Sequence, residues 1–238
     1  MNIVKWAALP LAVVLVLSPA FAGPPRGAAQ SAAVESAGQV KKVEDAIRVL
    51  DEMMKESDKS IPVGLIRDCA GIAIIPDVIK AGFVVGGRFG SGVVLIRTAG
   101  GGWSDPAFID IKGGSIGWQA GVQSADVILV FKTQRSIENI ARGKFTLGAD
   151  IGVAAGPLGR TAEASTDTQL KAEILSYSRS RGLYAGLTFQ GSSLQDDPKA
   201  NGLFYGGTVQ ARDIFDGKAK RRPEVVERLK AELVNFSK

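Results

Sequence analysis

The 238-residue chain contains no histidine. Histidine is the side chain that usually titrates near neutral pH, and it is the commonest metal ligand in proteins. Its absence excludes Ser-His-Asp and Cys-His catalysis, and it excludes zinc and haem sites that need a histidine ligand. Three classes of function remain: catalysis by carboxylates, metal sites with oxygen ligands, and binding without catalysis. The sequence therefore favours a binding protein without a cofactor.

Cysteine and long apolar runs are scarce as well. Cys69 is the single cysteine, so the chain cannot form an intrachain disulfide or a site with several thiolate ligands. The most apolar stretch beyond the N-terminus, residues 61–85, contains four charged residues and Pro76. A helix that spans a bilayer needs about 20 mostly apolar residues. No such segment is predicted after the N-terminal region.

The first 22 residues have the pattern of a secretory signal peptide. Lys5 supplies the positive start, residues 7–17 form a short apolar run, and Ala20-Phe-Ala22 is a small-x-small cleavage site. We expect a periplasmic or secreted protein, with a short membrane anchor as the alternative. The Pro/Gly/Ala-rich residues 23–33 are expected to be a disordered linker, and residues 34–238 a single domain.

The positive charge of the chain is small. A net charge of +5 suits an anionic surface without identifying it. The densest basic cluster, Lys218-Ala-Lys-Arg-Arg222, contains no aromatic residue. We interpret it as a solvated linker and expect no nucleic-acid partner.

Apolar residues at helical spacing predict helices at both ends of the chain. The first spans about residues 33–55, with an apolar stripe formed by Val40, Val43, Ile47, Leu50 and Met54. It is either a core-packing helix or an amphipathic helix on a membrane surface. The last helix spans about residues 223–236, and shorter helices are expected at 60–69 and 136–142.

Between these helices, short apolar runs and period-two alternation predict many strands. They include 72–75, stopped by Pro76, and a hairpin of 83–88 and 93–97 that turns at Phe89-Gly-Ser-Gly92. Further strands are expected at 107–112, 116–123, 126–131, 147–155, 160–165, 173–178 and 184–190. The links are too short for parallel crossovers. The predicted fold is α+β: a strongly curved antiparallel sheet or partial β-barrel of short Gly-rich strands, flanked by N-terminal and C-terminal helices.

Pairs of glycines four residues apart recur in these strands. Residues at that spacing face the same side of a strand, so the glycines allow either sheet curvature or close approach of a ligand. The pairs are Gly82/Gly86, Gly117/Gly121, Gly148/Gly152, Gly152/Gly156, Gly182/Gly186 and Gly202/Gly206.

Motifs that suggest catalysis lack the partners they need. Gly113-Gly-Ser-Ile-Gly117 matches the nucleophile elbow of α/β-hydrolases, but the chain has no histidine to act as the base, and a strand pattern follows. Two of the scattered aspartates could still act as an acid–base pair. Their spacing specifies no such pair, so we assign no catalytic or metal-ligating residue.

Basic residues near the predicted glycine turns are the best candidate binding site. They are Lys80, Arg88, Arg179 and Arg181. The planar guanidinium of arginine donates two hydrogen bonds to a phosphate at once. Several such residues on one rim would hold an anionic head group, whereas isolated ones are solvated.

Six segments, taken in order, resemble the SYLF domain family. They cover most of the chain between about Val43 and Gly206. The segments are Ile72-Ala-Ile-Ile-Pro76, Lys80-Ala-Gly-Phe-Val-Val-Gly-Gly-Arg-Phe-Gly-Ser-Gly92, Gly102-Trp-Ser-Asp-Pro-Ala-Phe-Ile109, Gly113-Gly-Ser-Ile-Gly-Trp-Gln-Ala-Gly121, Ala155-Gly-Pro-Leu-Gly-Arg160 and Tyr177-Ser-Arg-Ser-Arg-Gly-Leu183.

This resemblance implies a domain that binds anionic phospholipid or phosphoinositide head groups at a membrane surface. Eukaryotic members bind phosphoinositides partly through an amphipathic helix at the domain start, and some bind actin filaments. Bacterial members are exported or surface-associated. The helix at 33–55 matches the position of the membrane helix, and its basic residues are Lys41, Lys42 and Arg48. The alternative is a scaffold of the cell envelope without lipid specificity.

Overall fold

The computed structural model describes residues 26–55, 60–82, 85–116, 121–159, 169, 171–180, 183–184 and 189–238. The expected signal peptide at 1–22 and the expected strand at 160–165 lie outside these residues. Among the described helices, none has both the length and the hydropathy that crossing a bilayer requires.

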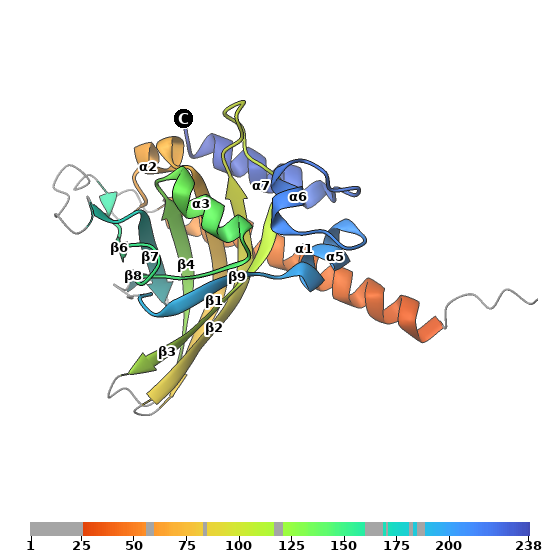
Figure 1. The fold of residues 1–238 in the computed structure, drawn as a ribbon, viewed down its shortest axis with the longest axis horizontal. Coiled ribbons are helices and arrows are strands. Elements are labelled where there is room, and N and C mark those ends of the chain that lie inside the picture. Colours follow the sequence, from red (N-terminus) through yellow and green to blue (C-terminus); the bar gives the residue numbers. More distant parts are fainter. Residues whose placement is uncertain are drawn as a thin grey trace, which may run out of the picture.

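The centre of the fold is a curled half-barrel sheet (Figure 1). Its strands follow the order β5-β9-β3-β2-β1-β4-β7-β6, and β8 pairs with β7. The strand bounds are β1 Gly71–Gly82, β2 Val85–Ile96, β3 Ala107–Ile116, β4 Gly121–Phe131, β5 Lys144–Thr146, β6 Val153–Ala155, β7 Ile174–Ser180, β8 Leu183–Tyr184 and β9 Ser192–Asp196. The predicted α+β class with a strongly curved sheet is confirmed. The sheet is mixed, however, because β6 and β7 pair in parallel.

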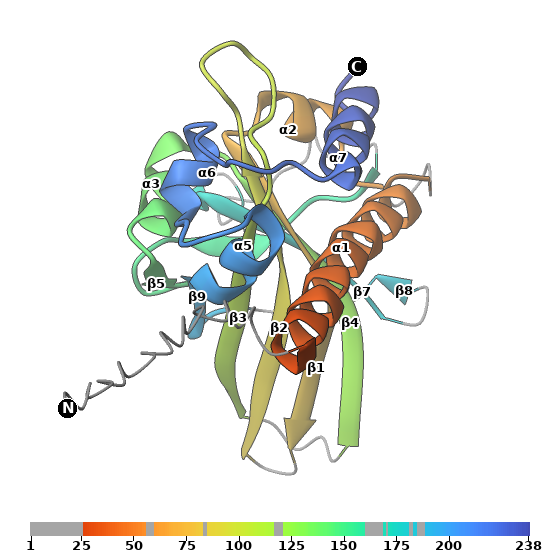
Figure 2. The ribbon, with the colours of Figure 1, turned by 90° about the vertical axis from the view of Figure 1, so that its right-hand side faces the viewer.

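Helices cover both faces of this sheet. Their bounds are α1 Arg26–Lys55, α2 Val63–Asp68, α3 Gln134–Ala141, α5 Pro198–Tyr205, α6 Ala211–Phe215 and α7 Glu224–Asn235. Helix α1 crosses one face, here called the outer face, and packs beside α7 (Figure 2). Helix α3 packs on the opposite, inner face, where Ile137 lies over Gly71.

The apolar stripe of α1 forms part of the core. Val43, Ala46, Leu50 and Met53 are fully buried against the sheet and the neighbouring helices. The core-packing interpretation of this helix is therefore confirmed. The helix begins at Arg26, within the stretch expected to be disordered, so it is longer than its apolar periodicity predicts.

The first hairpin turns at a different place from the one predicted. Strand β1 continues through Pro76 by a bulge, and Asp77 takes a positive φ of 49° there. Gly82 pairs with Gly86, so the chain reverses between these two residues, and β2 runs unbroken to Ile96. The segment Phe89–Gly92 lies inside β2 and is not a turn.

Glycine is needed in that segment because two strands approach closely. A Cβ on Gly92 would lie 2.2 Å from the carbonyl oxygen of Ile74, at the start of the bulge. Real Cβ atoms do not come that close to another heavy atom. Gly92 therefore allows β1 and β2 to approach closely at the bulge.

Candidate functional site

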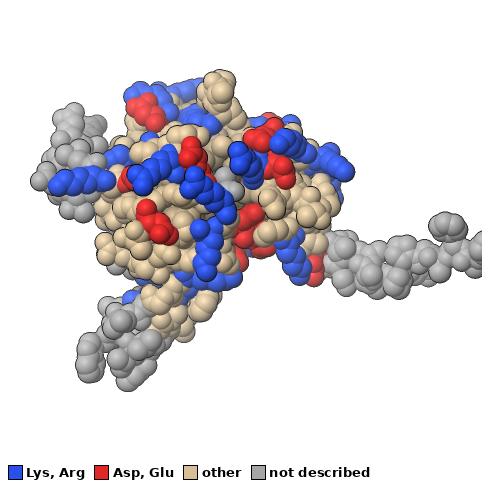
Figure 3. All heavy atoms as spheres, viewed as in Figure 1, with Lys and Arg blue, Asp and Glu red and all other residues tan. Residues whose placement is uncertain are grey.

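The far ends of β1 to β4 extend beyond α1 as a projection of the sheet (Figures 1 and 2). We call this part the distal sheet, and its described residues are 79–82, 85–90, 111–116 and 121–124. The charged residues among them are Lys80, Arg88 and Lys112, and none is a carboxylate. In Figure 3 the described atoms of this projection, at the lower left, include no red ones.

Three large apolar side chains are exposed on the outer face of the distal sheet. The exposed fractions are 45% for Ile79, 57% for Phe89 and 73% for Val122. Ile79 is paired directly with Phe89 across β1 and β2, and Val122 is paired with Ala81 on β1. Since paired residues face the same side, the three side chains belong to one apolar surface. We call it the apolar patch.

A hollow of about 450 Å³ adjoins this patch, between the sheet and the N-terminal half of α1. Its lining includes Ile79, Phe89 and three lysines, namely Lys41 and Lys42 from α1 and Lys112 from β3. Lys42 donates a hydrogen bond of 2.9 Å to Ser91 Oγ. Two lysines of the predicted membrane helix and residues of the distal sheet therefore line the same hollow.

Carboxylates partly neutralise the lysines around the hollow. Lys41 Nζ lies 2.7 Å from Asp45, and Lys112 Nζ lies 3.1 Å from Asp110. Both lysines are largely exposed, so these pairs are weak and screened by water. Their ammonium groups stay accessible to an anionic partner.

Two of the predicted head-group residues lie on the inner face of the distal sheet. Lys80 is paired with Arg88 across β1 and β2. Arg88 is buried: its Nη1 donates to Ser192 Oγ at 3.1 Å, and its guanidinium lies 4.7 Å from the centre of the Phe189 ring. Loss of water around the guanidinium lowers the pKa of Arg88. The Arg88 side chain is therefore buried on the inner face of the sheet, and the Lys80 side chain is the more exposed of the two.

Arg179 lies on the outer face, next to α1. It forms an ion pair with the Glu52 carboxylate, and its Nη1 donates a hydrogen bond of 3.3 Å to the Glu52 backbone oxygen. Arg48 also pairs with Glu52, at 3.2 Å, and lies 3.9 Å from Asp126. Burial raises the pKa of Asp126, although the hydrogen bond from the Asp77 amide opposes that shift. This ion network fastens α1 to β4 and β7.

The predicted cations therefore do not form one rim. Lys80 and Arg88 face one side of the sheet and Arg179 the other, while Arg181 lies outside the described residues. A single head group cannot contact Arg88 and Arg179 together. Sequence reasoning also missed Lys112, which alternates with apolar residues like any strand lysine.

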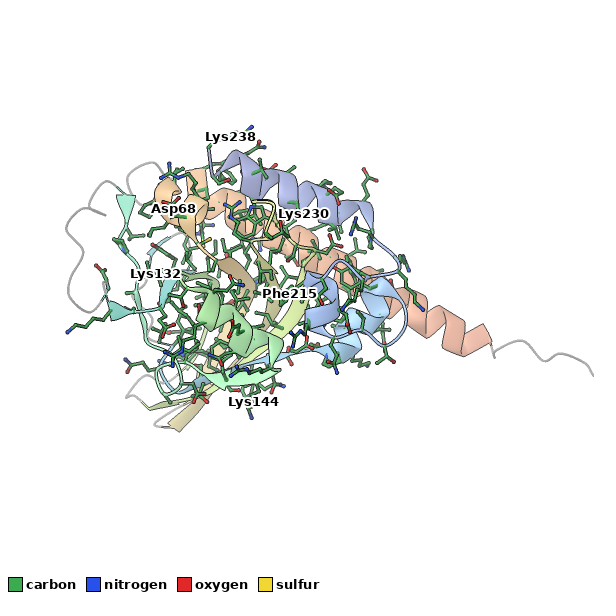
Figure 4. The ribbon with its side chains drawn as sticks, turned by 45° about the horizontal axis from the view of Figure 1, so that its top comes forward. Asp68, Lys132, Lys144, Phe215, Lys230 and Lys238 are labelled. Atoms are coloured by element: carbon green, nitrogen blue, oxygen red, sulfur yellow. The ribbon has the colours of Figure 1, made fainter. Side chains whose placement is uncertain are left out.

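Five aspartates spread along the chain each have a hydrogen-bond or ion-pair partner, namely Asp77, Asp105, Asp110, Asp126 and Asp150. Asp105 is buried and pairs with Arg222 at 2.7 Å and with Lys230 at 3.4 Å, which holds α7 to the loop before β3. Lys230 is labelled in Figure 4. No three potential metal ligands come together among the described residues. Ser115 lies within strand β3, where its backbone pairs with Gly86, so the strand-to-helix turn of a nucleophile elbow is missing at this serine.

A second basic surface surrounds α3, on the face shown in Figure 3. Arg135, Arg142 and Lys144 line a hollow of about 570 Å³ together with Glu138 and Asp150. Lys144 is labelled in Figure 4. Carboxylates lie among these cations, as they do around the hollow beside the distal sheet.

Comparison with known proteins identifies the family. A family model described as "Ysc84: Las17-binding protein actin regulator" matches residues 112–235. SH3 domain-containing YSC84-like protein 1 of Bos taurus is 37% identical over 202 residues, which cover 84% of this chain and 59% of that protein. The chain belongs to the Ysc84/SYLF domain family.

Other relatives of this SYLF chain agree. The Xenopus laevis protein of the same name is 39% identical over 172 residues, or 71% of the chain and 51% of that protein. LAS seventeen-binding protein 3 of Saccharomyces cerevisiae is 37% identical over 172 residues, or 71% of the chain and 37% of that protein. The chain thus spans about half or less of the length of these relatives. SYLF domains are lipid-binding modules and are generally not catalytic.

Proposed function

We propose that this SYLF domain binds anionic phospholipid reversibly at a membrane surface and catalyses no reaction. The observation that carries the proposal is the distal sheet, where exposed apolar side chains lie near lysines and the described strand residues include no carboxylate. The nearest carboxylates, Asp77 and Asp110, lie at its border. Membership in a family of lipid-binding modules supports lipid as the ligand class.

The lysines at this end of the molecule supply the attraction. Lys41, Lys42, Lys80 and Lys112 lie around the hollow or on the adjoining strands. Each basic residue near an anionic membrane contributes about 1 kcal/mol, and salt screens the attraction within about 10 Å at 0.1 M. Arg48 and Arg179 contribute less because Glu52 neutralises them.

We also propose that the chain acts outside the cytoplasm, because residues 1–22 read as a signal peptide. The membrane would then be one of the cell envelope. Phosphatidylglycerol and cardiolipin are suitable anionic probes for this case, and a phosphoinositide tests the head group that the resemblance implies.

Vesicle flotation tests the proposal directly. The chain is mixed with vesicles of phosphatidylcholine alone or with one of the three anionic lipids, at about 0.1 M and about 1 M salt. We expect flotation with the anionic vesicles at low salt and its loss at high salt. Equal binding to all vesicles at both salt concentrations would contradict an electrostatic attraction.

Paired charge variants locate the contact. Lys80→Gln with Lys112→Gln removes two cations of the distal sheet, and we expect about tenfold weaker binding or more. Arg142→Gln with Lys144→Gln removes two exposed cations beside α3 as the matched control. Loss of binding in the control pair alone would move the membrane contact to the α3 surface.

A protein-docking scaffold is the second candidate. The apolar patch favours it, because exposed apolar surface of this kind also marks protein interfaces. Capture of a partner from envelope extracts, together with no preference among vesicles, would support the scaffold.

A further inference from the structure

We propose that Ile79, Phe89 and Val122 enter the interfacial region of the bilayer as an apolar wedge while α1 stays packed on the domain. This inference rests on the proposed function and deepens it by naming the element that inserts. It moves the membrane contact from the apolar face of the N-terminal helix to the outer face of strands β1, β2 and β4.

The distribution of exposed apolar side chains singles out this surface. Six large apolar side chains are exposed in the described chain. Three of them form the apolar patch, and the other three, Val34, Val63 and Val234, lie on three different helices. Isolated exposed apolar residues are ordinary, but a cluster on one face indicates an interaction surface.

Small residues surround the patch, so nothing described covers it. Ala81, Gly87 and Gly114 share the outer face with Phe89 and Ile79 by strand register. A Cβ on Gly114 would meet no atom within 4 Å, and the Phe89 ring leans over Gly87. The apolar side chains are therefore open to solvent.

Charge decides between a bilayer and a protein as the occupant. The described distal sheet carries three cations and no carboxylate, although acidic residues make up 24 of the 238 positions in the chain. Asp77 and Asp110 border this sheet, and Asp110 pairs with Lys112 at 3.1 Å, so the single sign of charge is confined to the distal sheet itself. Apolar side chains beside cations are typical of segments that lie in an anionic membrane interface. A protein partner would also explain the apolar patch, but the lipid-binding family together with the cations of the described distal sheet favours the bilayer.

The hollow beside the patch fits the same orientation. Three lysines line it beside Phe89 and Ile79, and three aspartates partly offset their charge. The lysines are Lys41, Lys42 and Lys112, and the aspartates are Asp45, Asp77 and Asp110. When the apolar side chains enter the bilayer, these ammonium groups lie at the level of the phosphates. Apolar insertion and lysine–phosphate contacts can therefore form in the same orientation of the domain on the membrane.

Helix α1 cannot supply its apolar face without leaving the core. Val43, Leu50 and Met53 on that face are fully buried, and Arg179 binds Glu52 on its C-terminal half. Inserting the α1 stripe would open the domain. The distal sheet needs no such rearrangement, since its apolar side chains are already exposed.

A single-cysteine dye experiment distinguishes the two elements. In a Cys69→Ser background, Val122→Cys, Val34→Cys and Val234→Cys are each labelled with an environment-sensitive dye. Cys69 is buried and donates to the Ile66 carbonyl, a bond that serine can also make. Val34 lies on α1 and is 69% exposed, and Val234 lies on α7 and is 41% exposed. Thermal unfolding checks that each variant is folded.

With phosphatidylglycerol vesicles we expect a blue shift at position 122, quenched by spin-labelled lipid, and no change at 34 or 234. Phe89→Ala should bind about tenfold more weakly, whereas Val234→Ala should bind as the parent does. A shift at 34 without one at 122, or unchanged affinity of Phe89→Ala, overturns the wedge.

The two proposals can fail separately. Flotation with no shift at any position retains lipid binding and overturns the wedge, because contact is then purely electrostatic. A chain that does not float with any anionic vesicle overturns both.

Discussion

Replacing Gly92 with alanine tests the path of the chain through the first hairpin. The new Cβ would lie 2.2 Å from the Ile74 carbonyl oxygen and 2.7 Å from Ile75 Cα. Both are backbone atoms at the bulge of β1, so no side-chain rotation relieves the overlap. The strands must separate, and the hydrogen bonds beside the bulge weaken.

The expected cost can be estimated from measured overpacking. Extra carbon atoms in packed interiors cost about 1–3 kcal/mol. A backbone clash lies at the upper end, so we expect Gly92→Ala to lose about 3 kcal/mol of unfolding free energy. For a chain of this size, each kcal/mol shifts Tm by about 2–4 °C, which predicts a Tm lower by about 6–12 °C.

Gly114→Ala is the matched control. This glycine lies on the neighbouring strand β3, and a Cβ there would meet nothing within 4 Å. Its unfolding free energy should stay within about 0.5 kcal/mol of the parent. Thermal and urea unfolding measure both variants. A Gly92→Ala protein as stable as Gly114→Ala would refute the close approach of β1 and β2 at Gly92 and favour a turn at Phe89–Gly92.

Two further predictions concern buried groups. Burial raises the pKa of Asp126, so the native state holds this proton more tightly than the unfolded state, and stability falls as pH rises above 3.8 through the native pKa. Asp126→Asn should flatten the dependence of unfolding free energy on pH in urea titrations, and an unchanged slope would contradict the buried carboxyl. Burial also raises the pKa of the Cys69 thiol to about 11, so a thiol reagent should label it slowly in the native protein and fast in urea. Rapid native labelling would show that this part of the core opens.

Local sequence patterns were enough to predict several elements. Helices α1 and α7 follow from apolar spacing, and α3 ends where Gly143 takes a φ of 103°. Helix α5 was missed although Asp197 caps it and Pro198 begins it. Its eight residues include Gly202 and buried Asn201, so no apolar stripe revealed it.

The path of the first hairpin could not be predicted from local composition. The glycines at 90 and 92 look like a turn because glycine suits both turns and close strand contacts. Only the pairing of β1 with β2 distinguishes these uses, and that pairing depends on the bulge at Pro76 and Asp77. The local sequence does not specify the register of this pairing.

The candidate site depended even more on tertiary structure. Arg179 forms an ion pair with Glu52, which lies 127 residues away in the sequence. No local sequence pattern shows that this cation is neutralised. Phe89 and Val122 stand between polar residues or glycine like ordinary core-facing strand positions, and Ile79 follows the buried Val78. Their exposure arises because α1 ends its coverage before the sheet does (Figure 2).

The ends of the described sheet path bear on the behaviour of the protein at high concentration. The path finishes in β5 at one side and β6 at the other, and each has only three residues. Such short borders give an incoming strand few amide and carbonyl groups to pair with. When molecules are crowded together, these two borders therefore contribute little to strand pairing between them.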